Sequence, residues 1–314
     1  MDLGTFRAPS TAPWSKGWRT LVTEWIGDPA VMGCSASSCQ NAKKQVEDKF
    51  VEAVKWCQQD LTDFPSLSKG AVKHDRCKDE PERDLGDGVR YTGQWLDGKC
   101  HGKGLQTRSD GSSYEGTFRL GQQDGHGRLV AANGNVYEGQ WQEGQAHGYG
   151  KYLHDDGSTY AGEWFHDAKS GRGVERWSDG SKYEGEFRLN HKHGAGVYLA
   201  AFGKGAYDGQ FYEDAMDGQG TYLFADGRKY VGSWQGGAMH GEGAMDLPDG
   251  SRYVGEFKKN LKHGEGTFAW PNGRIYRGQW ANGKQDGVGR MSEASGVERR
   301  ARWMEGMELP GELQ

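Results

Sequence analysis

A short alternating pattern of aromatic, glycine and polar residues recurs along most of the chain. In the segment that begins at Tyr137, the first, third and fifth residues are Tyr137, Gly139 and Trp141, and Glu138 and Gln140 lie between them. Side chains of a β-strand alternate between the two faces of a sheet. The pattern therefore predicts a strand with the tyrosine, glycine and tryptophan on one face and polar residues on the other.

This segment begins a unit that occurs nine times in succession between residues 91 and 298. We number positions within a unit from its first tyrosine, and successive tyrosines are 23 residues apart except for one interval of 24. The position-1 tyrosines are Tyr91, Tyr114, Tyr137, Tyr160, Tyr183, Tyr207, Tyr230, Tyr253 and Tyr276. Position 5 is always aromatic, with Trp95, Phe118, Trp141, Trp164, Phe187, Phe211, Trp234, Phe257 and Trp280. Such a fixed period is typical of a repeat protein.

Glycine fills positions 3, 12, 14 and 21 in all nine units. Positions 12, 14 and 16 repeat the alternation on a second strand, and position 16 is often apolar, as in Tyr152. Asp-Gly or Asn-Gly stands between units in seven of nine cases, as in Asp110-Gly111 and Asn272-Gly273. This dipeptide predicts type I′ turns, which need positive φ at both central residues. We therefore expect nine β-hairpins, joined into a meander of eighteen strands.

Composition agrees with this prediction. The 314 residues include 52 glycines, but also 12 Trp, 14 Tyr and 11 Phe, and so many aromatics argue against disorder. Glycine within a strand costs about 0.5–1 kcal/mol relative to alanine. Neighbouring rings that lie flat on the bare backbone offset this cost, since an aromatic pair contributes about 0.5–1.5 kcal/mol beyond its buried area. Glycines also permit curvature. The expected fold is mainly β, an elongated curved antiparallel sheet preceded by a short helical region.

The unit Y-x-G-x-[WF]-x-x-G-x-x-H-G-x-G, followed by Asp-Gly or Asn-Gly, resembles the MORN repeat (membrane occupation and recognition nexus). The resemblance covers residues 91–298. It implies a non-catalytic scaffold or tether, often dimeric, at a membrane or at a cytoskeletal structure such as a flagellum. A protein partner, either a peptide or a helix, would then lie in an aromatic groove built from the position-1 and position-5 rings. Two alternatives are a regulatory subunit or fragment of a lipid kinase or methyltransferase, and a direct phosphoinositide-binding module.

Charge and motifs narrow the function further. The net charge of −5 is spread along the chain without a basic stripe, so we expect no nucleic acid partner. No nucleotide-binding or hydrolase motif occurs, so we expect no catalytic residues and no cofactor.

An odd number of cysteines without Cys-x-x-Cys, and no secretory signal, indicate a reduced cytoplasmic compartment. No stretch approaches the roughly 18 apolar residues of a transmembrane helix.

Position 11 forms a column of histidine and aspartate. Its residues include His101, His147, His193, His240, His263, Asp124, Asp217 and Asp286. Neighbouring units lie about 10 Å apart along such a sheet, so the column cannot bring two ring nitrogens to one metal ion. We expect no metal site. The side chains are predicted to hydrogen-bond the turn before the next glycine of their own unit.

The rest of the chain divides into four segments. Residues 1–40 have no clear periodicity, residues 64–90 read as a polar linker, and residues 299–314 hold a degenerate tenth unit and a tail. Residues 41–63 are predicted to form an amphipathic helix, because five apolar residues follow a three-to-four spacing. These residues are Val46, Phe50, Val54, Cys57 and Leu61. The helix is expected either to pack on the first hairpins and close a sheet edge, or to bind a partner.

Met32-Gly33-Cys34 resembles an N-myristoylation signal next to a palmitoylatable cysteine, with a serine at the sixth residue counted from Met32. The signal is internal, and myristoylation needs glycine at the N-terminus. One hypothesis is that translation also starts at Met32, with Gly33 myristoylated and Cys34 or Cys39 palmitoylated. Two acyl chains would give stable anchoring to a membrane surface. The alternative is that the match is a coincidence within a serine-rich loop.

Overall fold

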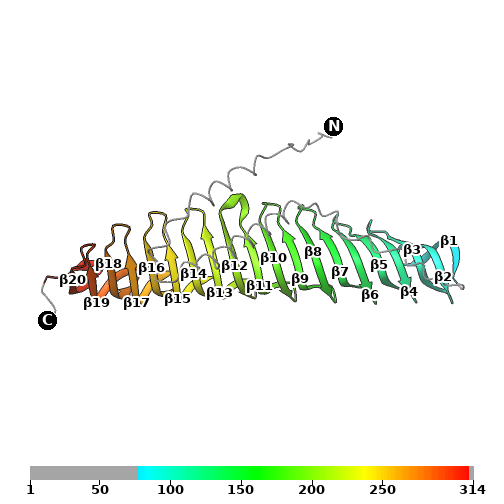
Figure 1. The fold of residues 1–314 in the computed structure, drawn as a ribbon. Coiled ribbons are helices and arrows are strands. Elements are labelled where there is room, and N and C mark those ends of the chain that lie inside the picture. The colour runs from blue at the N-terminus through cyan, green and yellow to red at the C-terminus, as the bar shows by residue number, and fades with distance from the viewer. Residues whose placement is uncertain (1–76, 311–314) are drawn as a thin grey trace, which may run out of the picture. The chain divides into compact units, whose positions relative to one another are not determined.

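The computed structural model describes residues 77–310, which form a single open antiparallel sheet of 21 strands (Figure 1). The first strands are β1 Lys78–Gly86, β2 Val89–Leu96, β3 Lys99–Arg108, β4 Ser113–Arg119, β5 Gln122–Val130, β6 Val136–Gln142, β7 Gln145–Leu153, β8 Thr159–Phe165, β9 Ala168–Arg176, β10 Lys182–Arg188 and β11 His191–Leu199. After a 3-10 turn, η2 Ala201–Gly203, come β12 Gly205–Tyr212, β13 Ala215–Phe224, β14 Lys229–Gln235, β15 Ala238–Asp246, β16 Arg252–Lys258, β17 Leu261–Ala269, β18 Ile275–Ala281, β19 Lys284–Ser292, β20 Glu298–Met304 and β21 Met307–Glu308. Each strand from β2 to β20 pairs with the strand before it and the strand after it, and β1 and β21 are the two edges. The predicted meander of hairpins is confirmed.

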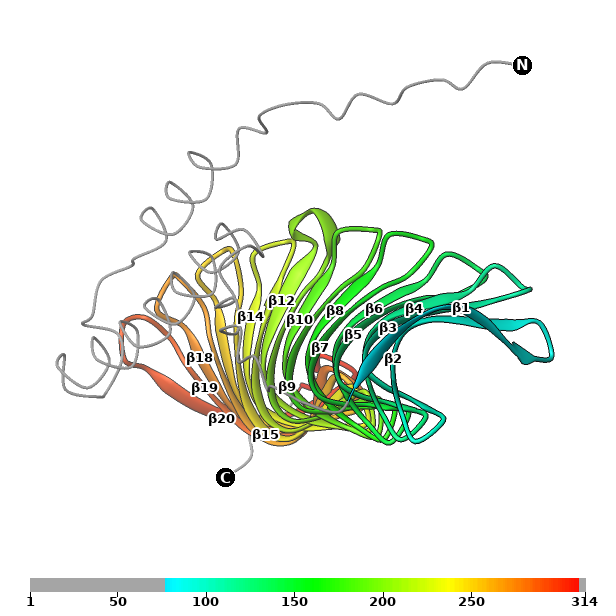
Figure 2. The same cartoon turned by 90° about the vertical axis from the view of Figure 1, so that its right-hand side faces the viewer.

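The register repeats from unit to unit. Tyr137 at position 1 lies opposite Tyr152 at position 16, and Gly139 at position 3 lies opposite Gly150 at position 14. We call the side that carries positions 1, 5, 10, 16 and 18 the ring face. The opposite face carries positions 2, 4, 13 and 15. Figure 2 shows that each strand curves along its length, as the glycine-rich middle of the strand permits.

Two kinds of turn alternate, and only one is the predicted type I′ turn. Positions 7 and 8 inside each unit both have positive φ, as at Leu189 and Asn190, and this is a type I′ turn. Between units only the glycine has positive φ, except after the fifth unit, where Phe202 also does. Gly111 donates to the carbonyl of Arg108. There the side chain of Asp110 accepts from the Ser112 amide, which holds the aspartate outside the left-handed region. The assignment of type I′ geometry to Asp-Gly was therefore wrong.

One boundary also differs from the sequence analysis. Residues 78–90, assigned to a linker, form β1 and the start of β2, because the chain continues the hairpin pattern through Asp87 and Gly88, both with positive φ. The interval of 24 residues, between Tyr183 and Tyr207, adds one residue near Phe202. It extends one turn as η2, and β11 and β12 stay paired from Gly194 to Leu199. The helix predicted over 41–63 and the irregular segment 1–40 lie outside the described residues.

Neighbouring within-unit turns are joined to one another. The position-8 amide of each unit from the second onward donates to the position-10 carbonyl of the preceding unit, as Asn190 does to Lys169. In four units the position-8 side chain also accepts from that position-10 amide. We call these side-chain bonds latches. They join Asp167 to Ala146, Asn190 to Lys169, Asp214 to Lys192 and Asn260 to Met239.

Candidate functional site

The ring face is built on a contact between the position-1 tyrosine and two glycines. In the fourth unit, a Cβ added at Gly162 would lie 2.6 Å from Tyr160 Oη, and one added at Gly173 would lie 2.5 Å from the same atom. The Tyr160 ring thus occupies the space that two side chains would take. Its hydroxyl donates to the carbonyl of Glu163 over 2.9 Å. Tyrosine therefore locks the bend of its own strand.

These rings form an unbroken ladder. Tyr160 meets Trp164 of its own unit and Phe187 of the next, edge to face, with both pairs of ring centroids 5.1 Å apart. The same two contacts recur in every unit and continue to Trp303 in the degenerate tenth unit. Edge-to-face packing is the favoured geometry for aromatic pairs. The ladder couples each unit to the next one.

The ladder is the core of the sheet rather than an open groove. The position-1 tyrosines are at most 3% exposed, and the position-5 rings are at most 8% exposed. Burial raises the pKa of all nine tyrosines, to about 12 for Tyr230 and Tyr276. The eighteen rings that the sequence analysis assigned to a partner groove therefore offer little surface. A partner on this face would meet the side chains beside them.

Those side chains form a second, half-buried column, which we call the apolar stripe. It lies on positions 10, 16 and 18 and packs against the ladder. Its members are Leu129, Tyr152, Trp177, Tyr198, Met216, Tyr222, Phe224, Leu247 and Trp270. The stripe covers units two to eight, whereas the first unit has Gln106 and Arg108 at positions 16 and 18. Sequence reasoning noticed the apolar position 16 but did not assign it to a site, and it missed position 18.

Lysines along the stripe turn their ammonium groups to the rings. The Lys262 ammonium lies 4.3 Å from the centre of the Phe268 ring and 4.8 Å from that of Trp280. Burial lowers the pKa of Lys262 to about 8, while the ring faces favour its charged form. Lys192 lies 5.0 Å from the centre of the Trp177 ring. These cations thus place positive charge against the rings of the stripe and of the ladder.

The nine repeated units match a known repeat family. A model of the MORN repeat matches residues 91–113, 114–136, 137–159, 160–182, 183–201, 207–227, 230–252, 253–273 and 276–296. The chain belongs to the MORN-repeat family. Such arrays are typical of repeat scaffolds and binding modules, and every matched segment of this MORN array begins at or next to a ladder tyrosine.

Solved structures add little to this identification. The TCP domain of SAS-4 from Drosophila melanogaster, solved in complex with a proline-rich motif of Ana2, is 13% identical with a TM-score of 0.32, over 62% of this chain and 99% of that one. A streptogramin B lyase is 10% identical with a TM-score of 0.17, over 71% and 82% of the two chains. Scores this low carry no argument about function. No curated protein matches the sequence.

Three position-11 side chains of the MORN array bond outward, to the turn of the next unit. Asp217 accepts from the amide of Gly236, and Asp286 from that of Glu305, in each case in the turn of the next unit. The Leu120 amide likewise points to Nδ1 of His101. For these three side chains the prediction that they bond the turn of their own unit was wrong, because the meander places the next turn beside them. Among residues 77–310, no three His, Cys, Asp or Glu side chains converge as metal ligands.

Position 4 has a structural role that sequence reasoning missed. Gln140 Oε1 accepts from the Tyr149 amide over 2.7 Å, and Gln279 Oε1 accepts from the Val288 amide over 2.9 Å. Each bond closes the bulge formed where the position-12 glycine, such as Gly148, takes a positive φ. The recurrence of Gln, Glu, Ser or Thr at position 4 was the available clue.

On the opposite face, positions 2 and 15 meet in one row that crosses every strand of the MORN array. Near its N-terminal end, Glu115 lies opposite Arg128, and Arg128 opposite Glu138. At its C-terminal end, Arg277 lies opposite Arg290, and Arg290 opposite Arg300. The row thus alternates between negative and positive side chains near its N-terminal end and carries only positive side chains at its C-terminal end.

The remaining sequence-based sites cannot be placed. Gly33, Cys34 and Cys39 lie outside the described residues. Within the described part, Cys77 and Cys100 are free thiols, and Cys100 is buried. None of the described residues belongs to a helix long and apolar enough to span a membrane.

Proposed function

We propose that this protein is a non-catalytic scaffold whose MORN array holds a protein partner along the apolar stripe. The observation that carries the proposal is the stripe itself. It is a run of half-buried apolar side chains on one face of seven consecutive units. A run of apolar side chains that stay partly accessible to solvent is typical of interaction sites.

An amphipathic helix suits this surface best. Each unit contributes two strands at about 4.8 Å, so the stripe repeats about every 9.6 Å. A helix rises about 10.5 Å in seven residues, so one apolar residue per heptad would stay close to one unit. An extended peptide covers the same distance in three residues, and its successive contacts would then point to opposite sides. The partner segment is accordingly an apolar-faced helix that crosses the strands.

The family resemblance supports a place for this scaffold in the cytoplasm, at a membrane or a cytoskeletal structure. Dimerisation through the array fits the same family pattern. These attributions rest on the resemblance, and the stripe supplies the contact surface through which the array would hold its partner there.

The test compares two substitutions of tyrosine by serine, one on the apolar stripe and one on the opposite face. Tyr198→Ser removes a ring from the stripe, whereas Tyr149→Ser removes a ring that is 60% exposed on the opposite face. Proximity labelling of the full-length protein in cells should lose specific neighbours in Tyr198→Ser and keep them in Tyr149→Ser. Tyr198→Ser also loses packing against the ladder, so both variants are compared at a temperature at which their melting curves show them folded. An unchanged set of neighbours in Tyr198→Ser and in the double variant Trp177→Ser/Tyr198→Ser would refute the proposal.

Acylation at Gly33 and Cys34 or Cys39 remains a prediction about how the scaffold is anchored. Intact-mass analysis of the native protein tests it. A species that begins at Gly33 and carries a myristoyl group is the expected result. Native protein that consists only of unmodified chains beginning at Met1 would rule it out.

A further inference from the structure

The C-terminal end of the opposite face carries three arginines on three neighbouring strands. Arg277 on β18, Arg290 on β19 and Arg300 on β20 stand directly opposite one another in the register. Like charges in directly opposite positions of an antiparallel pair are unfavourable. The sheet itself therefore gains nothing from this row.

The charges are not neutralised within the described part of the chain. Arg277 has one distant and exposed neighbour, Glu298, at 3.9 Å. Arg290 and Arg300 form no ion pair with any residue between 77 and 310. Protection of a sheet edge does not account for the row either, because β18 and β19 are interior strands.

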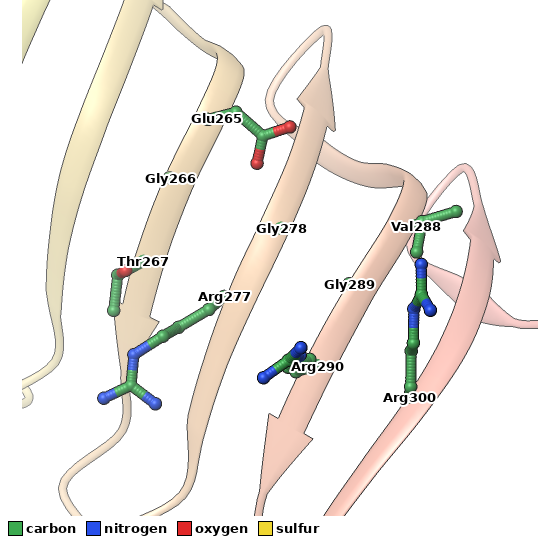
Figure 3. Close-up of a pocket in the computed structure, with 9 residues that line it drawn as sticks. All are labelled: Glu265, Gly266, Thr267, Arg277, Gly278, Val288, Gly289, Arg290 and Arg300. Carbon is green, nitrogen blue, oxygen red and sulfur yellow. The ribbon is translucent and has the colours of Figure 1, made fainter. Parts of the chain in front are cut away.

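The arginines border a hollow of about 560 Å³ (Figure 3). Its floor is the bare backbone of Gly266, Gly278 and Gly289, and Glu265 and Val288 stand on the side away from the arginine row. In Figure 3 the Arg300 side chain extends toward Val288, across the hollow. The site thus combines three guanidinium groups with a small apolar wall and glycine backbone.

We propose that this arginine row binds an acidic helix of a protein partner, through carboxylates placed at every first or second turn. The row lies on the face opposite the apolar stripe, so it is a second interaction surface that does not depend on the first. Guanidinium groups pair with carboxylates in a planar, two-bond geometry. The Val288 wall gives an apolar side chain of the helix a place beside the charges.

Spacing selects a helix that runs across the strands. Two steps between strands separate Arg277 from Arg300 by about 9.6 Å of sheet. On a helix, residues i, i+4 and i+7 share one face and span about 10.5 Å. Alternate residues of an extended peptide are about 6.8 Å apart, and three of them would overshoot the row.

A membrane surface fits less well than a peptide. The neighbouring row on the same face brings Glu242 opposite Glu256, and Glu265 lines the hollow itself. An anionic bilayer would have to approach these carboxylates together with the arginines, whereas a narrow helix laid over β18 to β20 meets the arginines and Val288 and leaves out Glu242 and Glu256 on β15 and β16.

The test is a binding measurement with the full chain and a labelled alanine-based helical peptide that has glutamates at i, i+4 and i+7. Arg290→Gln/Arg300→Gln should weaken binding by at least about tenfold, which corresponds to about 1.4 kcal/mol. Arg290→Lys/Arg300→Lys keeps the charge but loses the planar geometry of the guanidinium. Its affinity for the peptide should therefore lie between that of the wild type and that of the glutamine variant. Arg128→Gln is the matched control, since it removes an arginine from the same row where Glu115 and Glu138 stand opposite, and it should bind as the wild type does.

A second peptide, with the same number of glutamates distributed around the helix, should bind more weakly than the first. Vesicles of phosphatidylcholine and phosphatidylserine are the competing ligand. The proposal is overturned if the glutamine pair binds the striped peptide as well as the wild type does. It is equally overturned if the two peptides bind alike, or if the vesicles bind through the arginines more tightly than the striped peptide.

Discussion

The two faces of the sheet differ in what varies along them. On the ring face, every unit repeats the same tyrosine, the same pair of glycines and the same edge-to-face contacts, from Tyr91 to Trp303. On the opposite face, the row of positions 2 and 15 starts with alternating charges around Arg128 and ends with arginines around Arg290. The repeated face stabilises the fold, and the varied face is free to differ between the ends of one array.

The difference has a physical origin. A ring-face residue is held from four sides, by its own strand, two neighbouring strands and the next ring, so substitutions there cost packing energy. A residue on the opposite face touches mainly its cross-strand neighbours and water, and its identity changes stability little. Specific recognition is therefore easier to build on the second face, or on the half-buried stripe at the margin of the first.

The largest expected effect is the response of the ring face to alkali. The pKa of each of the nine ladder tyrosines is raised by burial above that of the unfolded chain. Their stabilising contribution is complete below about pH 10 and is lost as the pH rises toward the folded values. For each pH unit above about 10, each tyrosine lowers the free energy of unfolding by about 1.4 kcal/mol at most. Because nine tyrosines act over the same pH range, the array should unfold in one cooperative transition. Tyrosinate absorbance should rise together with the loss of strand circular dichroism; gradual ionisation of a folded array would contradict this.

A single glycine substitution on the ring face tests whether this face is more tightly constrained than the opposite face. Gly173→Ala places a methyl group 2.5 Å from Tyr160 Oη and 2.6 Å from Cε2, and the ring cannot retreat because Trp164 and Phe187 enclose it. We expect a loss of about 1–3 kcal/mol in urea unfolding. Tyr149→Ala on the opposite face should change stability by less than about 0.5 kcal/mol. Equal losses would mean that the two faces are equally constrained.

Much of this arrangement follows from the sequence. The alternation at Tyr137, Gly139 and Trp141 is enough to predict the strand, its faces and the seat of the ring on glycine. Turn geometry was assigned to the wrong dipeptide, because Asp110 satisfies its side chain locally and Leu189 takes a positive φ with no glycine beside it. Backbone conformation at such positions depends on hydrogen bonds to the neighbouring unit, which the local sequence does not display.

The candidate sites were harder to predict. In a one-layer sheet, exposure depends on which side chains of the next unit cover a residue. The ladder and the stripe therefore look alike in sequence but differ in burial. The arginine row joins residues 13 and 10 positions apart along the chain, Arg277, Arg290 and Arg300. Only the register that pairs position 2 with position 15 brings them together.

A smaller effect sharpens the role of the ladder hydroxyl. Tyr160→Phe keeps the ring but removes the bond to the Glu163 carbonyl. The expected cost is about 1 kcal/mol, visible as a lower urea midpoint. The comparison is Tyr212→Phe, whose ring is 55% exposed and which should be neutral. If both variants unfold at the wild-type midpoint, the hydroxyl does not hold the bend.

The smallest effect concerns charge on the opposite face. Arg290→Glu would give the C-terminal end the alternation found around Arg128, and should stabilise the protein by about 0.5 kcal/mol while abolishing binding of the acidic helix. Glu138→Arg would create a run of like charge at the N-terminal end and should destabilise by a similar amount. High salt should reduce both changes in melting temperature. Changes that are insensitive to salt would assign the effect to packing rather than charge.

The latches have a mechanical consequence. Three of the four tie units three to six together, and glycine occupies position 8 in the first three units, at Gly98, Gly121 and Gly144. Under tension along the ribbon, each latched junction must break an extra bond to a side chain before its strands can separate. Position-11 side chains supply a comparable bond at the first, sixth and ninth junctions. The array should therefore be stiffest between units three and six, and should yield first at a junction with neither a latch nor a position-11 bond, such as the one between units two and three.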